Sequence, residues 1–538
     1  MATSPQRAYR AACPNCGAPV EFASAASASA VCSFCRSTLV RDGEALKRIG
    51  VSAELFDDHS PLQLGASGSY KGLAFTLVGR LQYGYADGTW NEWHALFDSG
   101  RSGWLSEDNG AYVFAFDAAW PADAPPDAAA LLRLPVGRAL QVDGRAWTLA
   151  SVARTHLIAA EGELPQPPKL TGEFLVADLR NVQDEVGTLD YGDSAQGHWS
   201  TGRSVLLADL KLSGLKESGS EKTLAGRAFE CPSCGASLEV KLSTTQAITC
   251  NQCNTVIDVS QGVGGKLAHY RQNNSGEGGL QPLIPLGASA ELLLGTPVPA
   301  PWQVVGYLER CDLPAPGDDE EQVFWREYLL YNRELGFAFL VDSEEDGWSW
   351  VRPITGTPKA EAGGRVSWRG VTYVKGYRYA AKVTWVQGEF YWRVRRDEQA
   401  QVTDYKGSGS AAASRLAMEQ TAGEVVWSAG RTIDALQVAK AFGLSDTLAQ
   451  TFKRDAAPLA GGGGKSAAAL SKTAVLLLIF VLLMVILVTC SDDGCDDTRR
   501  AFGESSAEYQ QCLRNAGSGS SRTGGSSWGG YSSGGGHK

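Results

Sequence analysis

Eight of the twelve cysteines fall into two groups with the same spacing, and this spacing could bind a metal ion. Each group reads C-x2-C, fifteen residues, then C-x2-C. Two such turns supply the four thiolates that zinc binds at about 2.3 Å in a tetrahedron, with no position left for a catalytic water. The pattern predicts two structural Zn2+ sites in zinc ribbons rather than redox dithiols or iron–sulfur sites. The predicted metal ligands are Cys13, Cys16, Cys32, Cys35, Cys231, Cys234, Cys250 and Cys253.

A second pattern places a glutamate two residues after a tryptophan, in the runs WNEW and WREY. Residues two apart on a strand share a face, so the indole and the carboxylate of each run would point the same way. Such a carboxylate could contact a ligand, or it could be a structural group held by an arginine. The four residues are Trp90, Glu92, Trp325 and Glu327.

A further polar set recurs in the two halves of the chain. Paired carboxylates can do acid/base work when the fold brings them together, but turn and ion-pair roles are the more common use of such residues. The set consists of Glu173, Asp190 and Arg203, which we match with Glu389, Asp404 and Arg431.

These patterns recur because most of the chain reads as a tandem duplication. Matching segments keep their order while their offset drifts between about 214 and 235 residues, as loops of unequal length would cause. Apart from the cysteines and the aromatic runs, the matches are LGAS at 64–67 and 286–289, GEF at 172–174 and 388–390, DY at 190 and 404, and WSTGR at 199–203 with WSAGR at 427–431.

Short runs with alternating apolar residues fill both halves, for example GLAFTLVGRL and WQVVGYLER. Period-two alternation with many aromatic and β-branched residues indicates antiparallel strands. We therefore expect a mainly β fold of two tandem modules, each a small zinc ribbon followed by an antiparallel β sandwich or open barrel. Helical periodicity is expected only at residues 431–452, with a shorter counterpart in LLADLKLSGL.

The composition changes along the chain set the expected domain boundaries. The eighteen uncharged residues from Thr473 to Cys490 would form a transmembrane helix of roughly 27 Å, close to the hydrocarbon thickness of a bilayer. The expected parts are zinc ribbon 1 (10–48), β-rich domain 1 (50–220), zinc ribbon 2 (225–262), β-rich domain 2 (280–455), a flexible linker (456–472), the transmembrane helix (473–490), a short extramembrane segment (491–515) and a disordered Gly/Ser-rich tail (516–538).

Charge and compartment narrow the range of partners. The net charge of −10 gives no general attraction for nucleic acid, and only the first ribbon has a locally basic surrounding. The N-terminus has no apolar stretch typical of a secretory signal, and thiolate metal sites need a reducing compartment. We expect the N-terminal body to be cytoplasmic and the C-terminal tail to lie outside.

The order of these motifs resembles a bacterial domain-of-unknown-function family, family 4178. The ribbon is followed by LGAS, the W-x-E-[WY] run, a GW-containing strand, GEF and W-S-x-G-R, and the resemblance covers about residues 10–450. It implies tandem copies with cysteine ribbons, a membrane span in the bacterial inner membrane and a link to membrane stress. It brings no activity that could be assigned to residues.

The expected function is a membrane-anchored binding, scaffold or sensor protein that recruits a protein partner or senses a small ligand. One alternative is an enzyme that uses the carboxylates of the β domains, although the chain has no nucleophile elbow and no dinucleotide motif. A second alternative is nucleic-acid tethering through the first ribbon. We expect no catalytic residue and no cofactor other than zinc.

Overall fold

The structure is a computed structural model that describes residues 9–444 with internal gaps and leaves residues 1–8 and 445–538 undescribed. No described helix is both long and apolar enough to cross a membrane. The predicted span at residues 473–490, with the linker and tail around it, lies outside the described residues. The longest internal gaps are residues 52–59, 217–226, 260–268, 272–281 and 314–321.

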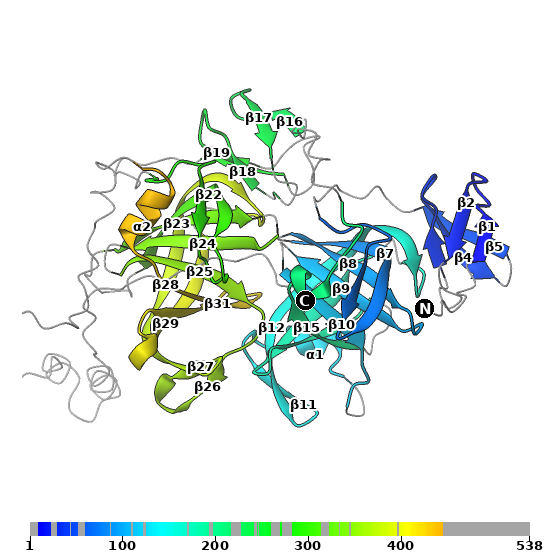
Figure 1. Cartoon of the computed structure of the whole chain (residues 1–538), viewed down its shortest axis with the longest axis horizontal. Coiled ribbons are helices and arrows are strands. Elements are labelled where there is room, and N and C mark those ends of the chain that lie inside the picture. Colours follow the sequence, from blue (N-terminus) through cyan, green and yellow to red (C-terminus); the bar gives the residue numbers. More distant parts are fainter. Residues whose placement is uncertain are drawn as a thin grey trace, which may run out of the picture. The chain divides into compact units, whose positions relative to one another are not determined.

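The larger part of module one is a barrel of antiparallel strands (Figure 1). Eight strands follow each other in the order β12-β13-β14-β15-β10-β9-β8-β7, and β12 also pairs with β7, which closes the ring. The strands are β6 (Ser67–Tyr70), β7 (Leu73–Tyr85), β8 (Thr89–Phe97), β9 (Ser102–Asp108), β10 (Ala111–Asp117), β11 (Ala139–Val142), β12 (Arg145–Leu164), β13 (Phe174–Asn181), β14 (Glu185–Asp190) and β15 (His198–Val205).

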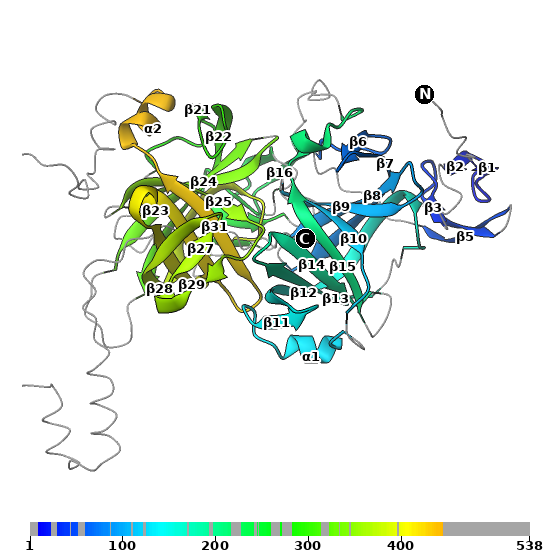
Figure 2. The same ribbon diagram turned by 60° about the horizontal axis from the view of Figure 1, so that its bottom comes forward.

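Module two repeats this ring in the order β28-β29-β30-β31-β25-β24-β23-β22, closed by pairing of β28 with β22 (Figure 2). Its strands are β21 (Ser289–Leu292), β22 (Ala300–Leu313), β23 (Phe324–Asn332), β24 (Gly336–Ser343), β25 (Gly347–Ile354), β26 (Lys359–Ala360), β27 (Val366–Trp368), β28 (Val371–Phe390), β29 (Gln399–Gly407), β30 (Ser414–Gln420) and β31 (Val425–Thr432).

The expectation of a mainly β fold in two tandem modules is confirmed, but the rings are closed, and neither is a sandwich or an open barrel. Closure depends on the twenty-residue strands β12 and β28, since each pairs with one neighbour along its first part and with the other neighbour along its second part. Gly162 and Gly388 lie near the ends of these strands with φ of 71° and 88°. A Cβ on either would lie 2.2–2.3 Å from a backbone carbonyl oxygen of the neighbouring strand, so only glycine fits there.

Short helical segments follow the last ring strand of each module, near the expected positions. In module one η1 (Leu207–Leu210) buries Leu210 against the core around Phe75. In module two α2 (Ala435–Ala441) begins after Asp434, whose side chain accepts a hydrogen bond from the backbone N–H of Gln437, and it buries Val438 in the apolar cluster that contains Trp302 and Tyr328. Three further short helical elements are described, namely α1 (Ala128–Leu132) and the 3-10 turns η3 (Ala362–Gly364) and η4 (Gly409–Ala411).

Each cysteine unit consists of two hairpins, of which only one is joined to the barrel. The first hairpin is a separate two-stranded sheet, and the second continues the barrel sheet by pairing with the end of β12 or β28. In module two Glu389 on β28 holds the join, since its carboxylate accepts hydrogen bonds from Lys241 N and Thr245 Oγ1. The strands are β1 (Tyr9–Ala12), β2 (Pro19–Phe22), β3 (Ser29–Val31), β4 (Ser37–Asp42) and β5 (Ala45–Val51), and in the second copy β16 (Arg227–Glu230), β17 (Ser237–Val240), β18 (Ala247–Thr249), β19 (Thr255–Asp258) and β20 (His269–Arg271).

Candidate functional site

The cysteine units bring four sulfurs together in each module. All ligand atoms of a group lie within 4.8 Å of one another. The closest sulfur pairs are 3.6–3.7 Å apart, far longer than the 2.03–2.05 Å of a disulfide bond. Sulfurs at about 2.3 Å from a tetrahedral zinc would be roughly 3.8 Å apart, so the spacing fits a metal centre. The groups are Cys13, Cys16, Cys32 and Cys35, and Cys231, Cys234, Cys250 and Cys253.

The turns that present the sulfurs share one backbone geometry. The residue after each C-x2-C pair donates its N–H to the carbonyl of the first cysteine at 2.8–2.9 Å and has a positive φ. Glycine takes this conformation without strain, which explains the Gly after the first pair of each group. The four positions are Gly17 (φ 78°), Arg36 (φ 56°), Gly235 (φ 74°) and Asn254 (φ 54°).

A hydroxyl two residues after the last cysteine supports one thiolate in each group. Ser37 Oγ lies 3.2 Å from Cys35 Sγ, and Thr255 Oγ1 lies 3.2 Å from Cys253 Sγ. The hydroxyl hydrogen bond is the main cause that lowers the pKa of Cys35 to about 5 and the pKa of Cys253 to about 6. Since metal binding requires thiolates, these hydroxyls favour the ligand form of the sulfur.

The second candidate site lies inside the barrels, where strand register makes the two modules comparable. Trp90 is paired with Tyr83 across β7 and β8, and Trp325 is paired with Arg310 across β22 and β23. Tyr83 of module one therefore stands where module two has Arg310. The short sequence VG-x-L precedes both residues, at 78–81 and 305–308, and identifies the same match.

In module two this position forms a buried ion-pair network. Arg310 and Glu327 are fully buried and Glu419 is 6% exposed. Arg310 Nη2 donates to Glu419 Oε1 at 2.7 Å, and its Nη1 lies 3.4 Å from Glu327 Oε1. The guanidinium also lies over the Trp325 ring, 5.7 Å from its centroid. Burial raises the pKa of Glu419, and the nearby Arg310 opposes that rise, so the guanidinium serves as counterion for buried carboxylates.

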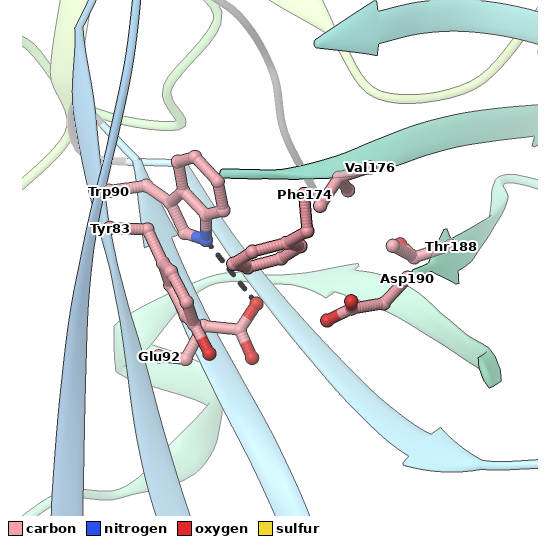
Figure 3. A pocket seen from close by; sticks show the side chains of 7 residues that line it. All are labelled: Tyr83, Trp90, Glu92, Phe174, Val176, Thr188 and Asp190. Carbon is pink, nitrogen blue, oxygen red and sulfur yellow. Dashed lines mark hydrogen bonds between the residues drawn. The ribbon is translucent and has the colours of Figure 1, made fainter. Parts of the chain in front are cut away.

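In module one the corresponding part of the barrel contains a small pocket that is partly open to solvent. Figure 3 shows the carboxylates of Glu92 and Asp190 pointing toward each other across it, beside the ring of Phe174. Tyr83 stacks on Trp90 with ring centroids 5.0 Å apart. The lining residues are Tyr83, Trp90, Glu92, Phe174, Val176, Thr188 and Asp190.

The W-x-E residues of module one line the pocket, whereas those of module two are buried beside Arg310, and both copies have the same hydrogen bond within the pattern. Trp90 Nε1 donates to Glu92 Oε1 at 3.3 Å. Trp325 Nε1 donates to Glu327 Oε1 at 2.7 Å. Each tryptophan therefore orients its glutamate, and the copies differ in what faces that glutamate.

The second recurring polar set does not form one site. Glu173 is exposed, and Arg203 is exposed and pairs with Glu185 at 2.8 Å. Only Asp190 lines the pocket. In module two Glu389 holds the cysteine unit, Asp404 accepts a hydrogen bond from Tyr379 at 2.9 Å, and Arg431 is exposed.

Two of the matches predicted between the copies are wrong. Strand register places Glu163, and not Glu173, at the position of Glu389, because Gly162 and Gly388 pair with equivalent glycines of β7 and β22. Register also places Asp190 opposite Val176 and Glu419 opposite Val402, so Asp190 corresponds to Glu419 and not to Asp404. The GEF and DY matches are local coincidences of short motifs.

Sequence reasoning missed Tyr83, Arg310 and Glu419. The signal for the first two was available in the VG-x-L repeat, counted forward to the residue across from each tryptophan. Glu419 could not be found by counting back from the W-S-x-G-R motif, because the loops before Trp199 and Trp427 differ in length by one residue. Only strand register gives the match, since Trp199 pairs with Leu189 and Trp427 pairs with Met418, the residues directly before Asp190 and Glu419.

The comparison with protein families finds one match in both barrels. The model of the family described as Domain of unknown function (DUF4178) matches residues 63–207 and 299–435, which together are more than half of the chain. The chain therefore belongs to this family, in two copies, as the sequence motifs predicted. No curated protein and no solved structure matches the chain.

Proposed function

We propose that this member of the family is a binding protein in which module one holds a small ligand inside its barrel and module two is a structural copy. The observation that carries this proposal is the difference at one barrel position. Where module two has the buried Arg310 between Glu327 and Glu419, module one has Tyr83 beside a pocket lined by Glu92 and Asp190. If both modules bound a ligand in the same way, we would expect the same residue at this position in both barrels.

The cysteine groups in this proposal hold Zn2+ and have a structural role. Four sulfur donors at tetrahedral spacing, with no nitrogen or oxygen ligand among them, suit zinc and leave no coordination position for chemistry. Their task is to stabilise the small hairpins, whose apolar clusters contain only seven and ten residues, three of them cysteines in each.

The proposed location is the bacterial inner membrane, with the barrels in the cytoplasm and the tail outside. The uncharged stretch Thr473–Cys490 supports a membrane anchor, and the thiolate groups support a reducing compartment for the barrels. Ligand binding close to a membrane would suit a sensor or scaffold that passes its state to a protein partner. In this account nucleic acid is not a partner.

The binding role can be tested without knowing the ligand. Full-length protein is incubated with the low-molecular-weight fraction of a bacterial cytoplasm, and hydrogen exchange is measured peptide by peptide. We expect protection on β7, β8, β13 and β14. A matched variant is Ala153→Tyr, because module two has Tyr379 at this register position, where its ring packs against Trp325.

The filled variant should lose the protection while its exchange elsewhere stays unchanged. Equal protection of β22 and β23 in module two, or no protection in module one, would contradict the assignment of the binding role to module one.

A further inference from the structure

We propose that the pocket of module one binds the guanidinium head group of a small organic cation, which pairs with the carboxylates that match the partners of Arg310 in module two. This inference rests on the proposed function, because it names the class of ligand for the same pocket. It is argued from three observations, namely the charge of the lining, the arrangement in the sister module and the shape of the walls.

The lining combines negative charge with aromatic surface. Of the seven lining residues, two are carboxylates, three are aromatic and none is basic. Trp90 and Glu92 are 3% and 7% exposed, so the inner part of the pocket is largely shielded from water. Carboxylates in such surroundings attract a cation, and aromatic faces add to that attraction.

Module two shows how this geometry holds a guanidinium. Arg310 extends from the strand position of Tyr83 and makes ion pairs with Glu327 and Glu419. Those two carboxylates stand at the register positions of Glu92 and Asp190. Module two therefore shows how this carboxylate pair binds a guanidinium. Module one has carboxylates at the same two positions, but a tyrosine in place of the arginine.

The walls favour a planar cation over a metal ion. The Tyr83 and Trp90 rings are stacked with an angle of 24° between them, and Phe174 packs edge-on against Tyr83 with centroids 5.9 Å apart. A guanidinium stacks on aromatic faces and presents a fork of N–H donors that matches carboxylates. Calcium would need six to eight oxygen ligands, which three aromatic rings and one valine do not supply.

The pocket accepts a head group from one side. Tyr83, Phe174 and Asp190 are half-buried, whereas Thr188 and Glu92 are buried, so the open side lies at the former three. Asp190 Oδ1 accepts the N–H of Gly192 at 2.6 Å, which fixes the carboxylate at the rim. A ligand would place its guanidinium inward between the carboxylates and its alkyl chain outward past Phe174.

The test uses full-length protein labelled with 5-fluorotryptophan and follows the Trp90 resonance, which is assigned from the variant Trp90→Phe. The probes are methylguanidinium, methylammonium, urea and the capped tripeptide acetyl-Gly-Arg-Gly-amide. We expect a saturable shift of the Trp90 signal with methylguanidinium, and no shift with urea, the neutral analogue of the same shape. A response to the tripeptide as well would show that an arginine side chain can supply the head group, and its absence assigns the site to free guanidines.

Two variants test whether binding depends on the negative charge of the pocket and on the residue at position 83. Tyr83→Arg installs the arginine of module two and should abolish the methylguanidinium shift, while Glu92→Gln should weaken binding about tenfold or more, since it removes one charged partner. Unchanged folding is checked from the other fluorotryptophan signals. A wild-type protein that ignores methylguanidinium, or that responds equally to urea or more strongly to methylammonium, would overturn the inference.

The outcome can be told apart from failure of the proposed function. If cytoplasmic small molecules protect the module-one strands from exchange while methylguanidinium leaves the Trp90 signal unmoved, the pocket binds a ligand of another class. If neither experiment gives a response, the binding role itself is wrong.

Discussion

Tyr83 and Arg310 occupy the same position in two barrels of one chain, each directly across from the tryptophan of a W-x-E pattern. In module two Arg310 belongs to a buried ion-pair network, whereas in module one Tyr83 lies beside a pocket with acidic and aromatic walls. Both copies keep the tryptophan that donates to its glutamate. The two modules thus have carboxylates at the same positions, and they differ in whether Tyr83 or Arg310 lies beside these carboxylates.

The buried arginine of module two should be replaceable by a free guanidinium. Arg310→Ala leaves Glu327 and Glu419 buried without their counterion, and such a loss costs about 3–5 kcal/mol of folding free energy. Millimolar methylguanidinium should restore part of this loss in a thermal or urea melt, because the vacated space matches its shape. Methylammonium serves as control for ionic strength, and equal recovery with both cations would speak against a guanidinium-shaped site.

The metal content should report the two cysteine groups separately. Purified full-length protein should contain about two zinc per chain, and Cys234→Ser should reduce this to about one, because three thiolates bind zinc more weakly than four. Elemental analysis of both proteins in parallel measures the ratio. Hairpins that stay folded in metal-free protein, as judged by their amide exchange, would refute a structural role for zinc.

Acid should weaken module one through His94. Burial lowers the pKa of this histidine, whose Nδ1 lies 2.9 Å from Glu163 O and whose Nε2 lies 2.9 Å from Ser102 Oγ. The unfolded chain takes up a proton near pH 6.5 that the folded barrel resists, so stability is complete at neutral pH and declines as the pH falls below about 6.5. Module two has Leu329 at this position.

His94→Leu should therefore flatten the loss of stability between pH 7 and pH 5, measured as the urea midpoint at each pH. Leu329→Ala, a change in the matching position of module two that leaves no titratable group, is the control and should lower stability at both pH values alike. An unchanged slope in His94→Leu would show that another group causes the acid sensitivity.

Local patterns of the sequence were enough to predict the cysteine groups, the duplication and the β class, since spacing, repetition and alternation are local properties. Ring closure was not predictable in the same way. It depends on which residues of β12 and β28 leave one neighbour and join the next. For β12 this change falls between Thr155, which pairs with β13, and His156, which pairs with β7, and no local motif marks that step. A sandwich and a barrel have the same alternation along each strand.

The pocket was only half predictable. Trp90, Glu92 and Asp190 carry visible polar patterns and were chosen for them, and all three line it. Tyr83 has the pattern of an ordinary strand residue. It was missed because a search for repeats looks for identical residues, and at this position the two modules differ. The misassigned partners Glu173 and Asp404 have the same cause, because short identical motifs outweighed the register that pairs distant strands.

The number of guanidinium sites per chain tests the central claim most directly. Equilibrium dialysis of the full-length protein against radiolabelled methylguanidinium counts them without reference to any spectroscopic signal. The account predicts one saturable site per chain in the wild type and none in Tyr83→Arg. Two sites per chain, no site, or one site that persists in Tyr83→Arg would contradict it.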